Sequence, residues 1–296
     1  MRKGLLVESE NLSEVGRYLR RTFELWGYRE IFLPAIEEYS ENLRKGTRFA
    51  YNNGFYVIKP DITSQILENI KEPPERLKLY YISEVLDGGV RGQWQAGVEY
   101  IGGDVTKMAA EVILTAVTAL EALGIEEFYV DVGSLRVWEE ATEEIAEFRG
   151  EVYRALVRRN FEIIERLPIS GEKKEELWEL FNFWGKESGY RKLDRIVEAV
   201  NDERLFIDFG TVRPLPYYRD VLFEVYSPEL GKPLGGGGEY TFKGKPAFGF
   251  AFDMGALSKL FKKKGDRNRK KLSGKPGEVF AEAKRLVRMG IPVEVE

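Results

Sequence analysis

The chain has 296 residues, of which 43% are hydrophobic and 32% charged, and its formal net charge is −4. These proportions indicate one large globular domain or two, with enough apolar material to fold unaided. The sequence contains no cysteine and no histidine, which excludes disulfides, Cys/His zinc sites, a catalytic thiolate and a histidine general base. It has no apolar run of about 18 residues and no signal-peptide pattern, so we expect a cytoplasmic protein. The net charge gives no overall footprint of nucleic-acid binding.

The first predicted element is an amphipathic helix that leads into a strand. Asn11 or Ser13 is the expected N-cap and Gly27 the expected end. The strand is predicted over 27–37, where Pro34 suits an edge or interface position. The helix is indicated by apolar residues that recur at helical spacing: Leu12, Val15, Leu19, Phe23 and Trp26.

A short hairpin is predicted over 51–58, since Asn52-Asn53-Gly54 favours a tight type I′ turn. The next residues, Lys59-Pro60-Asp61-Ile62-Thr63, precede a predicted helix over 64–70. Asp61 or Thr63 is placed to cap that helix, so one of them is expected at a helix N-terminus.

A second hairpin, over 79–103, carries an unusual set of polar residues. Its strands are rich in aromatic and β-branched residues, and the glycines after Asp87 can supply a turn. The polar residues of this hairpin are Asp87, Arg91, Gln95 and Glu99. Polar groups stay buried in such a segment only when a partner or a ligand satisfies them. Gln95 and Glu99 are expected on one face of a strand. A purely structural hairpin is the alternative.

The remaining chain alternates between helical and extended patterns. A helix is predicted over 105–123, closed by Gly124, and a helical insertion over about 134–204. Strands are predicted over 128–132, 206–210 and 221–226, and the chain is expected to end in a helix over 277–289 and a strand over 291–295. The basic run 262–271 is read as a solvated linker, with contact to an anionic partner as the alternative.

Arg213, Tyr217 and Tyr218 form a candidate ring-binding wall, because a tyrosine offers both an apolar face and a hydroxyl to a ligand. The glycine-rich stretch over 234–240 allows close approach of the backbone to a ligand. It is not a phosphate-binding P-loop, because no Lys-Ser/Thr pair follows at the required spacing.

Several of these segments resemble, in order, the motifs of class II aminoacyl-tRNA synthetases, and of histidyl-tRNA synthetases in particular. Residues 12–37 resemble motif 1, through which those enzymes dimerise. Lys59-Pro60-Asp61-Ile62-Thr63 resembles Arg-Pro-Glu-Gly-Thr, whose acidic residue holds the α-amino group of histidine. Residues 95–99 closely follow Gln-x-Gly-Val-Glu, and residues 213–218 resemble the histidine-specific loop Arg-Gly-Leu-Asp-Tyr-Tyr.

The resemblance implies an α+β fold: a class II synthetase-like catalytic core with a six- or seven-stranded, mostly antiparallel sheet flanked by helices, plus the helical insertion. The core is expected over 1–260, with a linker and a short helix and strand over 261–296. Pro214 and Pro216 depart from the family's loop and are expected to change its local geometry. By the resemblance, histidine is held by Asp61, Thr63, Arg91, Gln95, Glu99, Arg213, Tyr217 and Tyr218.

Two positions depart from the synthetases where those enzymes bind ATP. Asp87 stands where motif 2 has the arginine that grips the α-phosphate, and Ala256 where motif 3 has the arginine for the γ-phosphate. Close repulsion between a carboxylate and a phosphate in a partly buried site costs several kcal/mol. In addition, only residues 261–296 follow the core, where a synthetase carries an anticodon-binding domain.

The sequence keeps the residues that face histidine in the synthetases and lacks the arginines that face ATP. This pattern is similar to that of the regulatory subunits of short-form ATP phosphoribosyltransferases. That similarity implies a subunit without catalytic activity, cofactor or metal, which pairs with the short catalytic subunit and allows feedback inhibition by histidine. A homodimer through the motif 1-like region, within a hetero-oligomer, is implied as well, and tRNA is not an expected partner. The alternatives are an active synthetase-like ligase and a free-standing amino-acid sensor.

Overall fold

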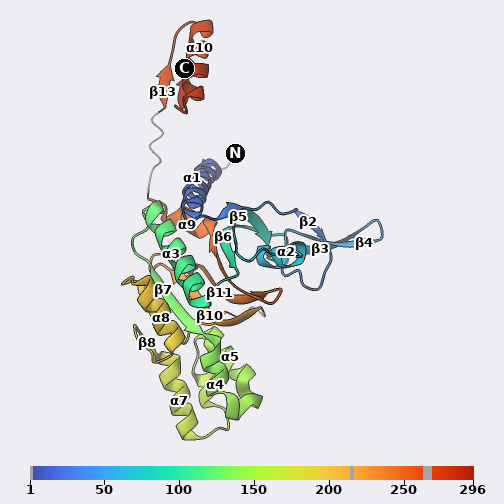
Figure 1. The fold of residues 1–296 in the computed structure, drawn as a ribbon, viewed down its shortest axis with the longest axis vertical. Helices are drawn as coiled ribbons and strands as arrows, with labels where there is room; N and C mark the ends of the chain where they lie inside the picture. Colours follow the sequence, from blue (N-terminus) through green and yellow to red (C-terminus); the bar gives the residue numbers. More distant parts are fainter. Residues whose placement is uncertain (1–2, 88, 214–216, 263–268) are drawn as a thin grey trace. The chain divides into compact units, whose positions relative to one another are not determined.

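The computed structural model of the chain describes residues 3–87, 89–213, 217–262 and 269–296 (Figure 1). The chain divides into two compact units, Met1–Phe261 and Lys262–Glu296. The larger unit is an α+β structure in which helices flank a large sheet, and this confirms the predicted fold class. None of the described helices combines the length and the apolarity needed to cross a membrane.

The large sheet holds nine strands in the described part of the chain, in the order β1-β5-β6-β12-β11-β10-β7-β9-β8. Two neighbouring pairs, β1/β5 and β7/β9, are parallel, and the other pairs are antiparallel. The sheet is larger than expected because two edge strands of two residues each extend it. In sheet order the strands are β1 Arg29–Glu30, β5 Leu77–Leu86, β6 Gly92–Ile101, β12 Lys245–Asp253, β11 Pro233–Phe242, β10 Tyr218–Tyr226, β7 Tyr129–Ser134, β9 Leu205–Asp208 and β8 Trp184–Gly185.

Helix α1, Lys3–Leu25, begins earlier than its apolar pattern indicates. Asn11 and Ser13 lie inside it, so the predicted N-cap was wrong; the polar stretch before Leu12 continues the helix without adding to its apolar face. Gly27 does end the helix region, with φ at +81°. The single strand predicted next is also wrong, because the chain leaves the large sheet after β1 and pairs again only in β2, Ile36–Glu38.

Strand β2 belongs to a small sheet of order β2-β4-β3, with β3 at Thr47–Tyr51 and β4 at Gly54–Ile58. The predicted tight turn is present, and Asn52 and Asn53 both adopt positive φ. Helix α2, Ile62–Asn69, follows. Of the two residues predicted to cap this helix, Asp61 is the N-cap and Thr63 lies inside the helix. Asp61 Oδ2 accepts a hydrogen bond from the Ser64 N–H at 3.0 Å.

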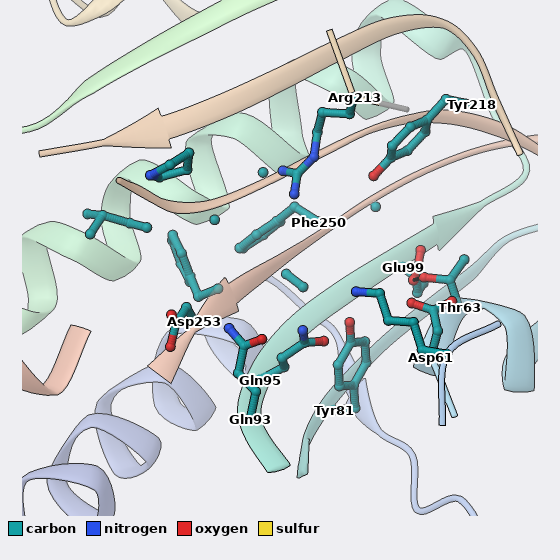
Figure 2. A pocket seen from close by; sticks show the side chains of 18 of the residues that line it. Asp61, Thr63, Tyr81, Gln93, Gln95, Glu99, Arg213, Tyr218, Phe250 and Asp253 are labelled. Carbon is teal, nitrogen blue, oxygen red and sulfur yellow. Dashed lines mark hydrogen bonds between the residues drawn. The ribbon is translucent and has the colours of Figure 1, made fainter. Parts of the chain in front are cut away.

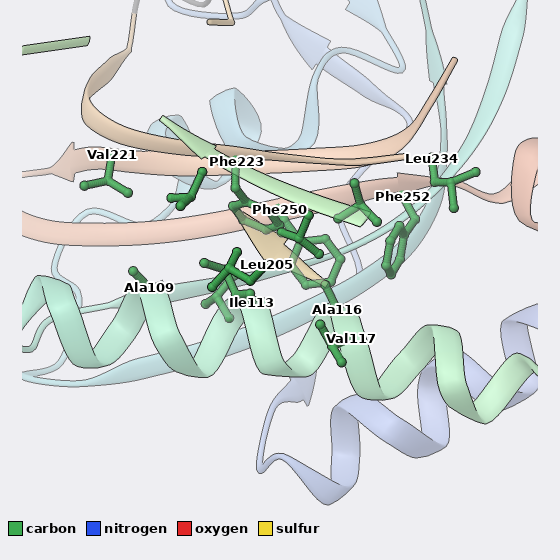
Figure 3. Packing of buried hydrophobic residues seen from close by; sticks show 14 of the residues in the cluster. Ala109, Ile113, Ala116, Val117, Leu205, Val221, Phe223, Leu234, Phe250 and Phe252 are labelled. Carbon is green, nitrogen blue, oxygen red and sulfur yellow. The ribbon is translucent and has the colours of Figure 1, made fainter. Parts of the chain in front are cut away.

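Helix α3, Val105–Leu123, has the predicted limits, and Gly124 closes it at φ +74°. Figure 3 shows Ala109, Ile113 and Ala116 of this helix packed against Phe223 and Phe250 of the sheet. Burial of each such phenylalanine stabilises the fold by about 1.5–3 kcal/mol. This face of the sheet is therefore covered by an apolar core.

The predicted insertion is helical, except that it contains the edge strand β8. Its helices are α4 Leu135–Ala141, the 3₁₀ helix η1 Glu143–Phe148, α5 Arg149–Arg158, α6 Glu162–Glu165, α7 Gly171–Asn182 and α8 Arg191–Val200. Strand β8 was missed because it is too short for a periodic signal, although it pairs with β9.

The smaller unit contains α10, Pro276–Arg288, together with β13, Lys270–Leu272, and β14, Val293–Val295. The final helix and strand were predicted. Strand β13 was not, because its lysines fall in the basic run that was read as a linker; it pairs in parallel with β14. Within that run, residues 263–268 lie outside the described part of the chain.

Candidate functional site

A cavity of about 330 Å³ opens on the face of the sheet opposite α3. Strand β6 explains its polarity, because Gln95 and Glu99 face the cavity while Ala96 and Val98 belong to the apolar core. Strands β5, β10, β11 and β12 and the N-terminus of α2 supply the other walls. In Figure 2 the hydroxyls of Tyr81 and Tyr218 point toward the same space.

Most of the predicted ligand-binding residues meet in this cavity. Seven of the eight line it: Asp61, Thr63, Gln95, Glu99, Arg213, Tyr217 and Tyr218. Arg91 is the exception. It is an exposed residue of the turn before β6, where its carbonyl oxygen accepts from the Asp87 N–H at 3.3 Å, and it does not line the cavity.

Glu99 is the most enclosed charged group of the cavity, with 2% of its surface exposed. Its Oε1 accepts a hydrogen bond from Thr63 Oγ1 at 2.6 Å, and its Oε2 accepts one from the Tyr240 hydroxyl at 2.7 Å. Burial raises the pKa of Glu99 to about 7, against the lowering effect of these two donors. The carboxyl group is thus poised near neutral pH to accept a hydrogen bond from a ligand or to donate one.

Asp61 and the two adjacent tyrosines form further parts of the lining. Burial raises the pKa of Asp61, and the Ser64 N–H that it caps opposes that shift. The rings of Tyr217 and Tyr218 meet edge to face, with their centroids 4.9 Å apart. Pro214, Leu215 and Pro216 lie outside the described residues, so the predicted effect of the two prolines on this loop stays a prediction.

Arg213 brings a positive charge to the cavity. Its buried Nη1 has no hydrogen-bond partner, and its Nε lies 3.8 Å from Glu224 Oε1, which is too long for a hydrogen bond. Gly236 makes room for it, because a Cβ there would lie 1.9 Å from Nη1. A buried guanidinium nitrogen without a partner marks a place where a ligand acceptor is expected.

Sequence reasoning missed several lining residues, and some of them reach the cavity only through strand register. Tyr81 is one example: it pairs with Gly97, and a Cβ at Gly97 would lie 2.6 Å from the Tyr81 hydroxyl. Their sequence signal is a glycine opposite a large side chain, which is readable only once the register is known. The others include Lys45, Gln93, Lys232, Tyr240, Phe250 and Asp253.

The two positions implied to have lost ATP-binding arginines differ in their surroundings. Ala256 is fully buried in the first turn of α9, Met254–Leu260, where its N–H donates to Asp253 Oδ1 at 3.0 Å. Asp87, however, is an exposed turn residue outside the cavity. The expectation of a costly repulsion in a partly buried site was therefore wrong for Asp87, because water screens an exposed charge.

In the described part of the chain, no group of three or more carboxylate, histidine or cysteine side chains is arranged to hold a metal ion. What the cavity offers is a carboxyl pair, a guanidinium and tyrosine hydroxyls around a small volume. These groups complement a zwitterionic amino acid that also carries a side-chain hydrogen-bonding group.

Solved structures share this fold over 81% or more of the chain. An ATP phosphoribosyltransferase regulatory subunit/histidyl-tRNA synthetase from Bacillus halodurans C superimposes with a TM-score of 0.82 at 21% identity, covering 100% of this chain and 91% of that one. One chain of the ATP phosphoribosyl transferase (HisG:HisZ) complex from Thermotoga maritima superimposes with a TM-score of 0.69 at 19% identity, covering 81% of this chain and 96% of that one. The fold is that of the histidyl-tRNA synthetase-like class II enzymes.

Proteins of similar sequence are named either as ATP phosphoribosyltransferase regulatory subunits or as histidine–tRNA ligases. An ATP phosphoribosyltransferase regulatory subunit from Geobacter metallireducens is 29% identical over 88% of this chain and 72% of its own length. A histidine–tRNA ligase from Methanocaldococcus jannaschii is also 29% identical, over 79% of this chain and 68% of its own. The family model of histidyl-tRNA synthetase matches residues 1–195 and 185–257, which is more than half of the chain. The chain belongs to the histidyl-tRNA synthetase family.

Proposed function

We propose that this chain is a regulatory subunit of a short-form ATP phosphoribosyltransferase, without synthetase activity of its own. It would be required for the first step of histidine biosynthesis and would let histidine inhibit that step. Relatives named as such regulatory subunits support the proposal, as does the fold shared with a chain of an ATP phosphoribosyl transferase complex. Because ligases match at a similar identity, the residues of the site carry the distinction.

The single observation behind the proposal is the contrast between two ends of one hairpin. At Glu99, on β6, a buried carboxylate is held by two donors inside the cavity. At the turn between β5 and β6, an exposed aspartate, Asp87, stands where the resemblance implies a phosphate-binding arginine. The second such arginine is replaced by Ala256, whose methyl group cannot bind a phosphate. The proposal is therefore that the chain keeps the amino-acid side of the site and has lost the nucleotide side.

Histidine fits the cavity by complementary groups. In the proposed pose, Asp61 accepts from the ammonium group and the partner-free Nη1 of Arg213 donates to the carboxylate. The imidazole lies between Glu99 and Tyr218, which offer an acceptor and a hydroxyl on the two sides. Tight binding needs both ring nitrogens to be satisfied, so an amino acid with an apolar side chain of similar size would lose the hydrogen bonds to Glu99 and Tyr218.

Inhibition would require histidine to bind with different affinity to the active and the inhibited assemblies. A subunit that holds histidine in this pocket meets that requirement if the pocket changes shape between the two assemblies. The proposed partner is the short catalytic subunit, and co-purification of the two chains from a co-expressing host is its direct test. If the catalytic subunit is fully active alone, the proposal that this chain is required for its activity is wrong.

Calorimetric titration with histidine tests the pocket. Glu99→Gln and Tyr218→Phe keep the shape of the site but remove a hydrogen-bonding group, so each is expected to weaken binding by about tenfold or more. Tyr51→Phe, at a tyrosine that is 63% exposed on β3, is the matched control and should bind as the natural chain does. Unchanged affinity in both pocket variants would move the histidine site elsewhere, for example to a subunit interface.

The rival function is an amino-acid ligase, and pyrophosphate exchange decides between them. With ATP and each amino acid in turn, the natural chain is expected to show no exchange above background. Exchange that depends on histidine would refute the regulatory proposal, even if the pocket binds histidine as described. A free-standing sensor is the third candidate, and it would bind histidine but leave the catalytic subunit unaffected.

A further inference from the structure

A second cavity, of about 490 Å³, lies at the carboxylate-bearing part of strands β7, β9 and β10. Each of these neighbouring strands contributes one acidic residue to it: Asp131, Asp208 and Glu224. This cavity shares Lys232 and Pro233 with the proposed histidine pocket, but none of its acidic residues lines that pocket. The proposed amino-acid site does not explain the presence of this second cavity.

Asp208 is the member whose charge is already satisfied. Its Oδ2 accepts from Arg159 Nη2 at 2.7 Å, and its Oδ1 accepts from the Gly210 N–H at 2.7 Å. A carboxylate with a guanidinium and a backbone donor has little need of a ligand. The carboxyl groups available to bind a ligand are therefore those of Asp131 and Glu224.

Asp131 is 7% exposed, yet its Oδ1 has no hydrogen-bond partner. Burial, with the nearby charge of Asp208, raises the pKa of Asp131 to about 7. Glu224 is its direct cross-strand partner, and Arg213 Nε lies 3.8 Å from Glu224 Oε1. Two like-charged groups facing each other across a strand pair are destabilising unless a proton or a cation lies between them.

Both cations that line the cavity already have carboxylate partners, Arg159 in Asp208 and Lys232 in Asp253, and two aromatic side chains are also part of its walls. Trp184 is 55% exposed, and its ring is held in place by stacking on Phe206 with centroids 3.9 Å apart. Tyr226 packs against Tyr129 at 5.7 Å. Fixed aromatic faces beside carboxylates attract ammonium and guanidinium groups through cation–π interactions.

We propose that this cavity binds an organic cation with an ammonium or guanidinium head, which contacts Asp131 and Glu224 and lies against Trp184 and Tyr226. A metal ion is disfavoured, because no described cluster of carboxylates has the arrangement that a metal needs. The inference does not depend on the proposed function, since none of the residues proposed to contact the cation is proposed to contact histidine.

The test is a titration of the full chain with n-butylammonium chloride, with 1-butanol as the uncharged analogue, followed by tryptophan fluorescence. Saturable quenching by the ammonium and none by the alcohol is expected. The signal should vanish in Trp184→Phe, and Asp131→Asn and Glu224→Gln should each weaken binding by about tenfold or more. Glu175→Gln, at an exposed glutamate on α7, is the matched control and should bind normally.

Three outcomes would overturn the proposal. Absence of saturable binding would mean that a proton shared by the two carboxyls satisfies them. Equal affinity in both carboxylate variants, or competition by saturating histidine, would place the probe elsewhere. Tighter binding of Mg²⁺ at Asp131 and Glu224 would make the site a metal site. Circular dichroism checks that the variants fold. If Asp131→Asn does not fold, the binding affinity of Glu224→Gln alone decides the test.

Discussion

Tyr240 on β11 and Glu99 on β6 form a hydrogen bond across the strand that separates them. That strand is β12, and at the crossing point it carries Gly249, which pairs with Glu99 on one side and Gly238 on the other. A Cβ at Gly249 would lie 1.9 Å from Glu99 Oε2. The bond exists because a glycine leaves the path open, so one residue without a side chain organises the most buried polar group of the site.

The first prediction is that Gly249→Ala disrupts both stability and histidine binding. The added methyl group forces Glu99 away from Tyr240, and overpacking of this kind costs about 1–3 kcal/mol. Chemical denaturation should report that loss in the free energy of unfolding, and calorimetry should report histidine binding weakened by about tenfold or more.

Gly150→Ala is the matched control for that substitution. Gly150 lies in α5 with nothing within 4 Å of its added Cβ, so alanine there should leave stability unchanged or raise it by up to about 1 kcal/mol. A Gly249→Ala chain as stable as the Gly150→Ala chain would show that Glu99 can move aside freely.

The second prediction concerns the pH dependence of stability. In the folded chain Glu99 has a pKa of about 7, against an ordinary value of 4.5. Between these values the folded state binds more protons than the unfolded state, so the free energy of unfolding falls as pH rises through this window and levels off above it. The size of the fall from Glu99 is about 3 kcal/mol.

Glu99→Gln removes this titration, so its profile lacks that fall. The measurement is denaturant unfolding of both proteins from pH 4.5 to 8, read as the difference between the two profiles, because Asp131 titrates near the same pH in both. The difference is expected to shift in favour of the variant as pH rises. A difference that is flat, or that shifts the other way, would contradict a raised pKa at Glu99.

The third prediction tests the core beneath the site. Phe23 is fully buried and packs against Tyr80 and Phe250, with ring centroids 5.7 and 6.1 Å away. Phe23→Ala should lower the free energy of unfolding by about 3–5 kcal/mol. Leu25→Ala, two residues along the same helix but 68% exposed, should change it by less than about 0.5 kcal/mol. Similar losses in the two variants would mean that α1 packs differently.

The parts of the fold that were predicted correctly are those with local causes. Asp61 caps its helix through the Ser64 N–H three residues on, and Gly124 ends α3 through its own positive φ. The start of α1 was missed because its apolar residues, such as Leu6 and Val7, are exposed and do not continue the buried face of the helix. The parallel pairing of β1 with β5 joins segments about fifty residues apart, and no local pattern encodes it.

The residues of the site likewise divide into those that a local pattern predicted and those that it could not. Gln95 and Glu99 lie on one strand face and line the cavity, as strand alternation predicted, and their contact with histidine stays a prediction. The same alternation would extend to Arg91, but β6 begins at Gly92, so the rule does not hold at the turn. Tyr240 was missed because its role depends on a bond across two strands, and that bond depends on a glycine in the strand between them.

The fourth prediction is that the chain forms a homodimer through the motif 1-like region, as the resemblance implies. Phe32, between β1 and β2, is 84% exposed in the single chain, which is costly for so large an apolar ring unless a partner covers it. Light scattering should find a dimer that Phe32→Glu converts to a monomer, while Phe280→Glu, 62% exposed on α10, leaves it intact. A dimer that survives Phe32→Glu would put the interface elsewhere.

The last prediction concerns Arg213, whose guanidinium passes over Gly236 to reach the cavity. A Cβ at Gly236 would lie 1.9 Å from Arg213 Nη1 and 2.5 Å from the Phe223 carbonyl oxygen, so Gly236→Ala should displace the guanidinium. Histidine affinity should then fall by about tenfold or more, because the ligand carboxylate loses a charge-assisted donor. Histidinol, which has no carboxylate, separates this effect from general damage, since Gly236→Ala should weaken histidine far more than histidinol. Equal weakening of both ligands would mean that Arg213 does not bind the carboxylate.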